Sequence, residues 1–181
     1  KSIDISDGLY PGKYLIKIGK VIKNKFGDKL VNLDIDDFHK KIKNLVLDKI
    51  LKLIKKDLSD LGIIMDVYTS ETSIIENGYL DKVLKILDEK NLIYTGILDK
   101  PKGNVQVTEW EPKPQLLFKS SLFGDDSDRA MKKSDGSWTY FANDIAYHLY
   151  KLEKREGDLI NILGADHSGY LLRLESAVNA L

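Results

Sequence analysis

A continuous apolar run at residues 158–163, Asp-Leu-Ile-Asn-Ile-Leu, restricts the fold of this chain more than any other segment. Helical patterns cover residues 139–155 before it and residues 171–181 after it, and Gly157 and Gly164 bound the run. An apolar stretch of this length between two helices is typical of a strand buried on both faces of a parallel sheet. The order of helix, strand and helix therefore predicts an α/β fold with an open parallel sheet.

Amphipathic spacing predicts three more helices in the first half of the chain. One covers residues 11–26, a long one begins at Asp34 or Asp36 and ends just before a glycine, and a third covers residues 80–90. Residues 63–68 read as a short strand between the second and third helices. Acidic residues interrupt the lysines of the long helix, which favours a solvated face over an RNA-binding stripe.

Residues 92–138 differ in character from the rest of the chain. Short β-type pieces at residues 92–95, 116–118 and 129–131 lie among turns rich in proline and glycine. This pattern predicts a small β-rich insertion. We therefore divide the chain into a helix-rich part with one strand (1–91), the β-rich insertion (92–138) and a helix-strand-helix part (139–181).

Composition excludes several classes of protein. The sequence has 28 Lys+Arg against 28 Asp+Glu, so any contact with nucleic acid would have to be local. It contains no cysteine, which excludes disulfides and zinc-thiolate sites. No apolar run approaches eighteen residues and no signal peptide pattern is present, so we expect a soluble cytoplasmic chain without a membrane partner.

The segment Gly164-Ala-Asp-His-Ser-Gly-Tyr170 lies at the carboxyl end of the apolar run, where open sheets bind ligands. Asp166 could cap the following helix or hold a ligand ammonium group. His167 could donate a hydrogen bond to a phosphate or a carboxylate. The local pattern leaves open whether this segment is a helix cap or part of a binding site.

Tyr140 and Asp144 lie one helical turn apart, on a face next to the core stripe of the preceding helix. A phenol and a carboxylate at this spacing could bind a cationic group through hydrogen bonds and charge together. The alternative is a tyrosine on the flank of the core and a surface aspartate.

Several motifs in this order closely resemble the bacterial arginyl-tRNA synthetases. They comprise the segment from Phe118 to Arg129, Ser134-Asp-Gly136, the helix start from Thr139 to His148, and the segment from Gly164 to Tyr170. Weaker similarity covers residues 70–78 and 7–12, so the resemblance extends over nearly the whole chain. Several motifs in one order at family-like separations are specific, whereas any one alone would be weak.

The resemblance implies a Rossmann-type catalytic domain that activates L-arginine with ATP and Mg²⁺ and transfers it to tRNA. Tyr140 and Asp144 match the positions that hold the end groups of the substrate, and we assign the guanidinium to Asp144. Asp166 matches a position that helps to bind the amino acid. Gly164 and His167 match positions near the adenylate.

Two signatures of this family are not present in the sequence. Neither a His-x-Gly-His motif nor a Lys-Met-Ser-Lys loop occurs, and Ser168 takes the place of the second histidine in the family's His-His-Gly-Tyr motif. We therefore expect the middle of a catalytic domain that is inactive alone. No side chain is required as a nucleophile, because the carboxylate of arginine attacks the α-phosphate, so we assign no catalytic residue.

Other interpretations remain at this stage. The chain could be a non-catalytic relic of the synthetase fold that binds arginine or a partner, or a synthetase of the same fold with another amino-acid specificity. The three histidines fall on separate elements, so we expect no metal site, and residues 124–128 favour a polar turn over a Ca²⁺ loop. We expect a monomer.

Overall fold

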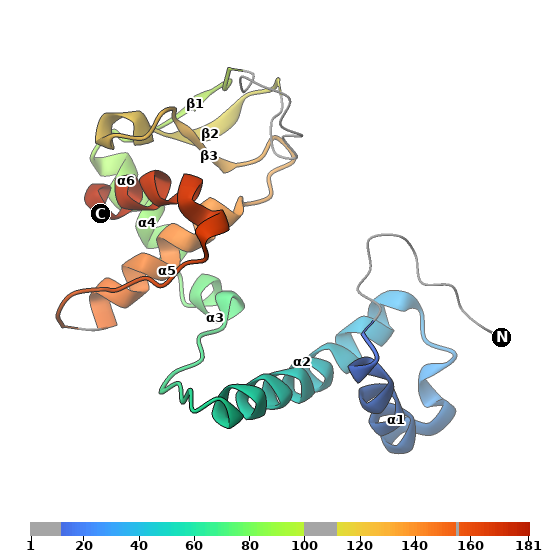
Figure 1. The fold of residues 1–181 in the computed structure, drawn as a ribbon. Coiled ribbons are helices and arrows are strands. Elements are labelled where there is room, and N and C mark those ends of the chain that lie inside the picture. Colours follow the sequence, from blue (N-terminus) through green and yellow to red (C-terminus); the bar gives the residue numbers. More distant parts are fainter. Residues whose placement is uncertain (1–11, 100–111, 155) are drawn as a thin grey trace. The chain divides into compact units, whose positions relative to one another are not determined.

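A computed structural model describes residues 12–99, 112–154 and 156–181 of the chain (Figure 1). The chain divides into two compact units, Lys1–Val67 and Tyr68–Leu181. Within the described residues, no helix combines the length and the apolar character needed to cross a membrane.

The first unit consists of helices α1 (Tyr14–Phe26) and α2 (Ile35–Asp60), joined by the short 3₁₀ helix η1 (Gly27–Leu30). Gly27 ends α1 with a φ of 57° and donates its N–H to the carbonyl of Lys23. A residue with a side chain is strained in this left-handed region, so glycine is suited to the position. Both helices lie where amphipathic spacing predicts them.

Asp34 caps α2 by accepting the N–H of Asp37 at 2.9 Å, as the sequence predicts for one of two candidate caps. Among the described residues of this unit, Ile18 and Leu30 are the buried hydrophobic ones, and no residue of α2 is buried. The apolar stripe of α2 is therefore only partly covered in this structure.

The strand predicted at residues 63–68 does not form. The residues after Gly62 have no ladder hydrogen bonds, and Ile64 is 83% exposed. A strand requires a partner strand for its backbone groups, and none of the described residues pairs with this segment. The segment is apolar, as the sequence shows, but its hydrophobicity alone does not supply a partner strand.

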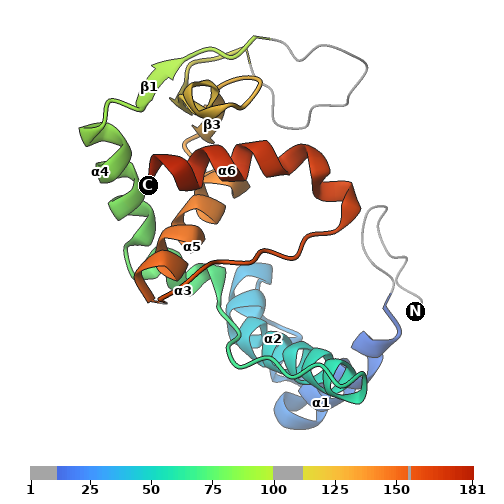
Figure 2. The ribbon, with the colours of Figure 1, turned by 60° about the vertical axis from the view of Figure 1, so that its left-hand side comes forward.

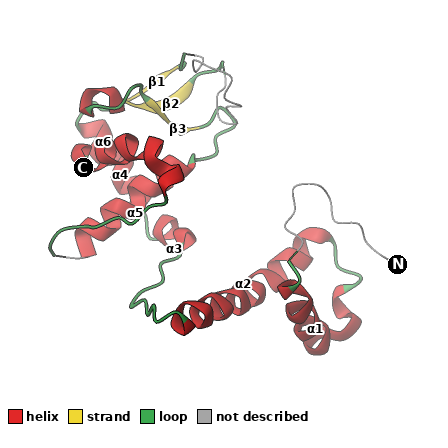
Figure 3. Cartoon of the chain, viewed as in Figure 1, coloured by secondary structure: helices red, strands yellow, loops and turns green. Residues whose placement is uncertain are grey.

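The second unit combines helices with a small sheet (Figure 3). Its elements in chain order are α3 (Glu71–Glu76), α4 (Tyr79–Glu89), β1 (Ile93–Gly96), β2 (Gln115–Phe118), η2 (Ser120–Phe123), β3 (Arg129–Lys132), α5 (Tyr140–Lys154), η3 (Ala165–Tyr170) and α6 (Leu171–Ala180).

The sheet is antiparallel in the order β1-β2-β3. Ile93 pairs with Phe118 in the first ladder, and Phe118 pairs with Arg129 in the second. These three strands coincide with the three short β-type pieces expected in residues 92–138. The sheet is thus the β-rich part that the sequence predicts.

Helix α5 lies beside both α4 and α6 in the second unit (Figure 2). Leu87 of α4 and Ile145 of α5 are fully buried, and Phe118 and Met131 bring the sheet into the same cluster. This cluster fixes one face of α5 against its neighbours. Asn143 and Asp144 of α5 lie outside this cluster.

Residues 158–163 form no strand in the structure, in contrast to the prediction. They are extended but unpaired, and Ile160 and Ile162 are 87% and 94% exposed. The sheet of the described residues is antiparallel and lies elsewhere, so it offers no edge to this run. The α/β class is confirmed, whereas no parallel sheet forms among the described residues.

Candidate functional site

A cavity of about 170 Å³ lies in the second unit, where the start of α3 meets α5. Six residues line it: Thr69, Glu71, Ile74, Asn143, Asp144 and Tyr147. Pockets that enclose a whole ligand measure about 300–1,000 Å³. This cavity has the size to take one end group of a small molecule.

Asp144 is the one predicted site residue that lines this cavity. It lies in the second turn of α5, and the hydroxyl of Tyr170 donates a hydrogen bond of 2.5 Å to its Oδ2. The ring of Tyr170 stands edge-on against Phe141, with centroids 6.4 Å apart. The packed ring and the hydrogen bond together orient the Asp144 carboxylate.

Glu71 and Asn143 form the other polar part of the cavity. Ser70 caps α3, which places Glu71 in the first turn of that helix. Asn143 donates through Nδ2 to Oε1 of Glu71 at 2.6 Å. A carboxylate only accepts hydrogen bonds, so this contact turns Oδ1 of Asn143 away from Glu71. That oxygen is buried and has no donor among the described residues.

The cavity wall is therefore acidic and rich in acceptors. A buried acceptor without a donor costs about 1–3 kcal/mol. A guanidinium is planar, always charged and able to bind carboxylates with two parallel hydrogen bonds. The lining of Glu71, Asn143 and Asp144 is suited to such a cation.

Glu71, Asn143 and Tyr170 were not assigned a role from the sequence. Glu71 falls in the weakly similar segment 70–78, and Tyr170 ends the segment 164–170, so both lay within recognised motifs. Their distance from Asp144 along the chain concealed the contact. Only the packing of α3 and η3 against α5 brings them together.

Tyr140 is the first residue of α5 and is 74% exposed. It lies one turn before Asp144, as the helical spacing predicts, but it does not line the cavity. The structure thus keeps the predicted face and places only its second member in the cavity.

Gly164, Asp166 and His167 lie on the turn that leads through η3 into α6. The backbone N–H of His167 donates to the carbonyl of Gly164 at 2.9 Å. Asp166 and His167 are exposed, with 3.7 Å between Oδ2 and Nε2. None of these three residues lines the cavity. Asp166 does not cap α6, because the N-terminus of that helix has no side-chain cap.

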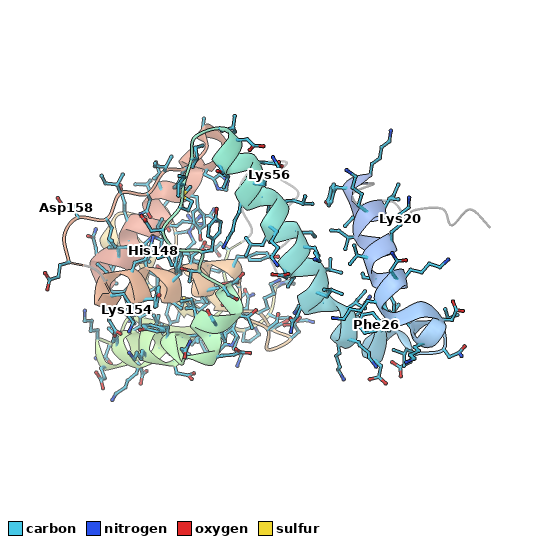
Figure 4. The ribbon with its side chains drawn as sticks, turned by 90° about the horizontal axis from the view of Figure 1, so that it is seen from below. Lys20, Phe26, Lys56, His148, Lys154 and Asp158 are labelled. Atoms are coloured by element: carbon cyan, nitrogen blue, oxygen red, sulfur yellow. The ribbon has the colours of Figure 1, made fainter. Side chains whose placement is uncertain are left out.

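A second cavity, of about 430 Å³, lies between α5, α6 and residues 158–163, which we call the extended segment. Its lining comprises His148, Leu159, Asn161, Leu171, Leu174, Glu175, Val178 and Asn179. Figure 4 labels His148 on α5, together with Lys154 near the end of that helix and Asp158 in the segment that follows.

His148 connects α5 to the extended segment. Its Nδ1 lies 2.8 Å from the carbonyl of Asp144, which can only accept, so Nδ1 carries the proton. Lys151 then donates to Nε2 of His148 at 3.0 Å and to Oδ1 of Asn161 at 2.7 Å. Burial lowers the pKa of His148. The hydrogen bond to the carbonyl of Asp144 opposes this effect, and the charge of Lys151 adds to it. Burial likewise lowers the pKa of Lys151.

The acidic residues before β3 are engaged in a structural cluster. Asp125 is 2% exposed in its side chain and receives hydrogen bonds from Nε and Nη2 of Arg129 at 2.7 and 2.6 Å. Burial alone would raise the pKa of Asp125, but the hydrogen bond and charge of Arg129 outweigh it and lower the pKa. Asp128 accepts from Tyr94 at 2.8 Å and from Ser121 at 2.5 Å. Across the described ranges, no group of three or more metal-ligating side chains occurs.

Known proteins resemble this chain along its whole length. No family model matches it. Curated arginine–tRNA ligases from Rickettsia bellii (strain OSU 85-389) and Ehrlichia chaffeensis are each 48% identical to it over 181 residues, which is 100% of this chain and 31% of theirs. A crystal structure described as an arginyl-tRNA synthetase from Campylobacter jejuni is 30% identical, with a TM-score of 0.80 over 99% of this chain and 35% of that chain.

The chain thus matches the aminoacyl-tRNA synthetases as a class of proteins. Within that class it matches part of arginyl-tRNA synthetase, so the resemblance predicted from the motifs is confirmed. The chain spans 31% of the length of the curated relatives.

Proposed function

We propose that this chain is the arginine-binding part of an arginyl-tRNA synthetase that activates L-arginine with ATP and transfers it to tRNA. The observation that carries the proposal is the acidic cavity, where Tyr170 orients Asp144 and Asn143 bridges to Glu71. The cavity is suited to the guanidinium end of the substrate. Its size leaves the α-amino and carboxylate groups of arginine outside it.

In this proposal Asp144 recognises the guanidinium, with Glu71 as the second carboxylate. Tyr140 and Asp166 are exposed and contact the parts of arginine that lie outside the cavity. Gly164 and His167 bind the adenylate, since the turn that carries them is open. These contacts position the substrates and stabilise their charges, which are the main contributions of a protein to acyl activation.

The chemistry needs no nucleophile from this chain. The carboxylate of arginine attacks the α-phosphate of ATP and displaces pyrophosphate. A terminal hydroxyl of tRNA then takes the arginyl group from the adenylate, and AMP leaves. In this proposal Mg²⁺ accompanies ATP as part of the substrate complex. The signature motifs that bind ATP are not in this sequence, and we propose that the chain alone does not aminoacylate tRNA. The complete enzyme is a cytoplasmic monomer in this proposal.

The two apolar segments without ladder partners support a further part of the proposal. Residues 63–68 and 158–163 are rich in apolar side chains, form no strand and are mostly exposed, and the chain covers 31% of the length of its curated relatives. We infer that both become strands of an open parallel Rossmann sheet with segments outside this sequence. Ile162→Ser in the full-length protein would then destabilise it by about 2–4 kcal/mol, measured by urea unfolding, whereas an unchanged midpoint would leave the segment outside any sheet.

The test of the arginine site is Asp144→Asn in the full-length protein, with arginine affinity measured by calorimetry. Loss of a charged partner of a desolvated ion pair costs about 2–5 kcal/mol, so affinity should fall roughly 30- to 5,000-fold. Asp88→Asn on the exposed surface of α4 is the matched control and should bind as the unchanged protein does. Unchanged affinity in Asp144→Asn would favour a synthetase with another amino-acid specificity. Arginine binding by a full-length protein that forms no arginyl-tRNA would favour the non-catalytic relic.

A further inference from the structure

Three lysines of α1 form one face of that helix. Lys17, Lys20 and Lys23 follow one another at intervals of three residues, so their side chains leave the same side. Ile18 and Ile22 lie on the opposite side, and Ile18 is 5% exposed. We call the three residues the α1 lysine face. All three are exposed.

No acidic residue accompanies this face along the helix. Between Gly8 and Gly27 the sequence contains five lysines and no Asp or Glu. In the part of the chain that the structure describes, none of the ion pairs involves Lys17, Lys20 or Lys23. The positive charges of the α1 lysine face therefore lie close together without compensation.

Helix α2 of the same unit provides the contrast. Aspartates are interspersed among its lysines, and Lys52 pairs with Asp48 at 3.1 Å while Lys56 pairs with Asp60. Figure 4 labels Lys20 on α1 and Lys56 on α2. The chain is rich in lysine throughout, so the number of lysines on α1 carries no weight by itself. The lack of acidic neighbours is what distinguishes α1 from α2.

A like-charged row on a helix repels itself, and an external polyanion relieves the repulsion. Lysine is a flexible point charge that contacts phosphates without reading bases. A membrane surface is the other common polyanion, and a helix that lies on it inserts its apolar face into the lipid. In α1 Ile18 at the centre of that face is buried against the protein, whereas Tyr14, Leu15 and Val21 at its edges are 48%, 39% and 41% exposed. Ile16, on the side of the lysines, is 60% exposed. The charge is therefore suited to a nucleic acid backbone.

We infer that the α1 lysine face binds the phosphate backbone of the tRNA substrate. The inference rests on the proposed function, which makes tRNA the substrate of the full-length enzyme. The contact is electrostatic and independent of base sequence. It contributes to affinity and to the rate of encounter, and it leaves the arginine site unchanged.

The experiment removes the three charges in the full-length protein. Lys17, Lys20 and Lys23 are changed together to Gln, and Lys41, Lys52 and Lys56 of α2 are changed together to Gln as the matched control. Affinity for the cognate tRNA is measured by filter binding from 0.05 to 0.3 M salt. We expect the α1 variant to bind about 10- to 100-fold more weakly at 0.1 M salt, with a salt slope reduced by about 2–3, while the control stays within threefold.

Changing the same three α1 residues to Arg keeps the charge and should keep tRNA affinity within threefold, which separates charge from loss of fold. The inference is overturned if the Gln variant binds tRNA as the control does, or if the Arg variant loses as much affinity as the Gln variant. It is also overturned if the lysines affect binding to phosphatidylserine vesicles but not to tRNA. Calorimetry of arginine binding to the unchanged protein tests the proposed function separately.

Discussion

Replacing Tyr170 with Phe removes a single hydroxyl and tests how the acidic cavity is organised. The ring stays in its edge-on packing against Phe141, so the change acts on the 2.5 Å hydrogen bond to Oδ2 of Asp144. Asp144 keeps its charge in this variant and loses its orienting partner. The substitution therefore separates the presence of the carboxylate from its placement.

The magnitude follows from what the hydroxyl does. Without it, the half-buried Asp144 gains rotamer freedom that arginine, in the proposed site, would have to remove on binding, at about 0.5–1.5 kcal/mol. This corresponds to arginine binding roughly 2- to 13-fold more weakly. The effect is much smaller than that of Asp144→Asn, which removes the charge itself. The folded state also loses a hydrogen bond to a charged group, worth about 1.5–3 kcal/mol when buried and less at this half-buried site.

Arginine affinity is measured by calorimetry on the full-length protein with Tyr170→Phe, Asp144→Asn and the double variant. If Tyr170 acts through Asp144, the hydroxyl is worth nothing once the carboxylate is gone, and the double variant matches Asp144→Asn. Additive losses in the double variant would refute this reasoning, since they would mean that Tyr170 contacts the ligand directly. An unchanged affinity in Tyr170→Phe would show that packing alone orients Asp144.

Three further outcomes follow from the described contacts. Arg129→Met leaves the buried Asp125 carboxylate without its partner and should lower the free energy of unfolding by about 3–5 kcal/mol, measured by urea denaturation. The pKa of His148 is lowered in the folded protein, so below about pH 6.5 the unfolded chain binds a proton that the folded chain does not. The free energy of unfolding should therefore decrease as the pH is lowered, by up to about 1.4 kcal/mol per pH unit. His148→Gln should flatten that part of the stability profile between pH 7.5 and 5.5, and an unchanged slope would assign it to another group. Leu87→Ala, at a fully buried position of α4, should cost about 2–5 kcal/mol in thermal or urea unfolding, while a loss below 1 kcal/mol would contradict the packing of the core.

Helices α1, α2, α4, α5 and α6 of this protein were accessible from the sequence because their causes are local, whereas α3 was not predicted. Asp34 accepts the N–H of Asp37 three residues away, and Gly27 adopts a left-handed φ at the end of α1. Apolar spacing determines the buried side of α5 in the same way, through Ile145 and its neighbours one turn apart. Such signals depend on a few adjacent residues, so no knowledge of the remaining chain was needed.

Strand pairing depends on a partner distant in sequence. Residues 158–163 have the hydrophobicity of a buried strand, yet they stay unpaired and exposed in this structure, because hydrophobicity alone does not supply backbone hydrogen bonds. The three strands that do form have their partners within the described chain.

The candidate site divides in the same way. The sequence alone determined the position of Asp144 on α5 and, through its motifs, the similarity to arginyl-tRNA synthetases that the relatives confirm. Only the tertiary structure decided that Tyr170 orients this carboxylate, that Glu71 lies across the cavity and that Tyr140 stays exposed. Glu71 lies 73 residues before Asp144 and Tyr170 lies 26 after it, and contacts over such separations arise from the packing of whole elements rather than from local spacing.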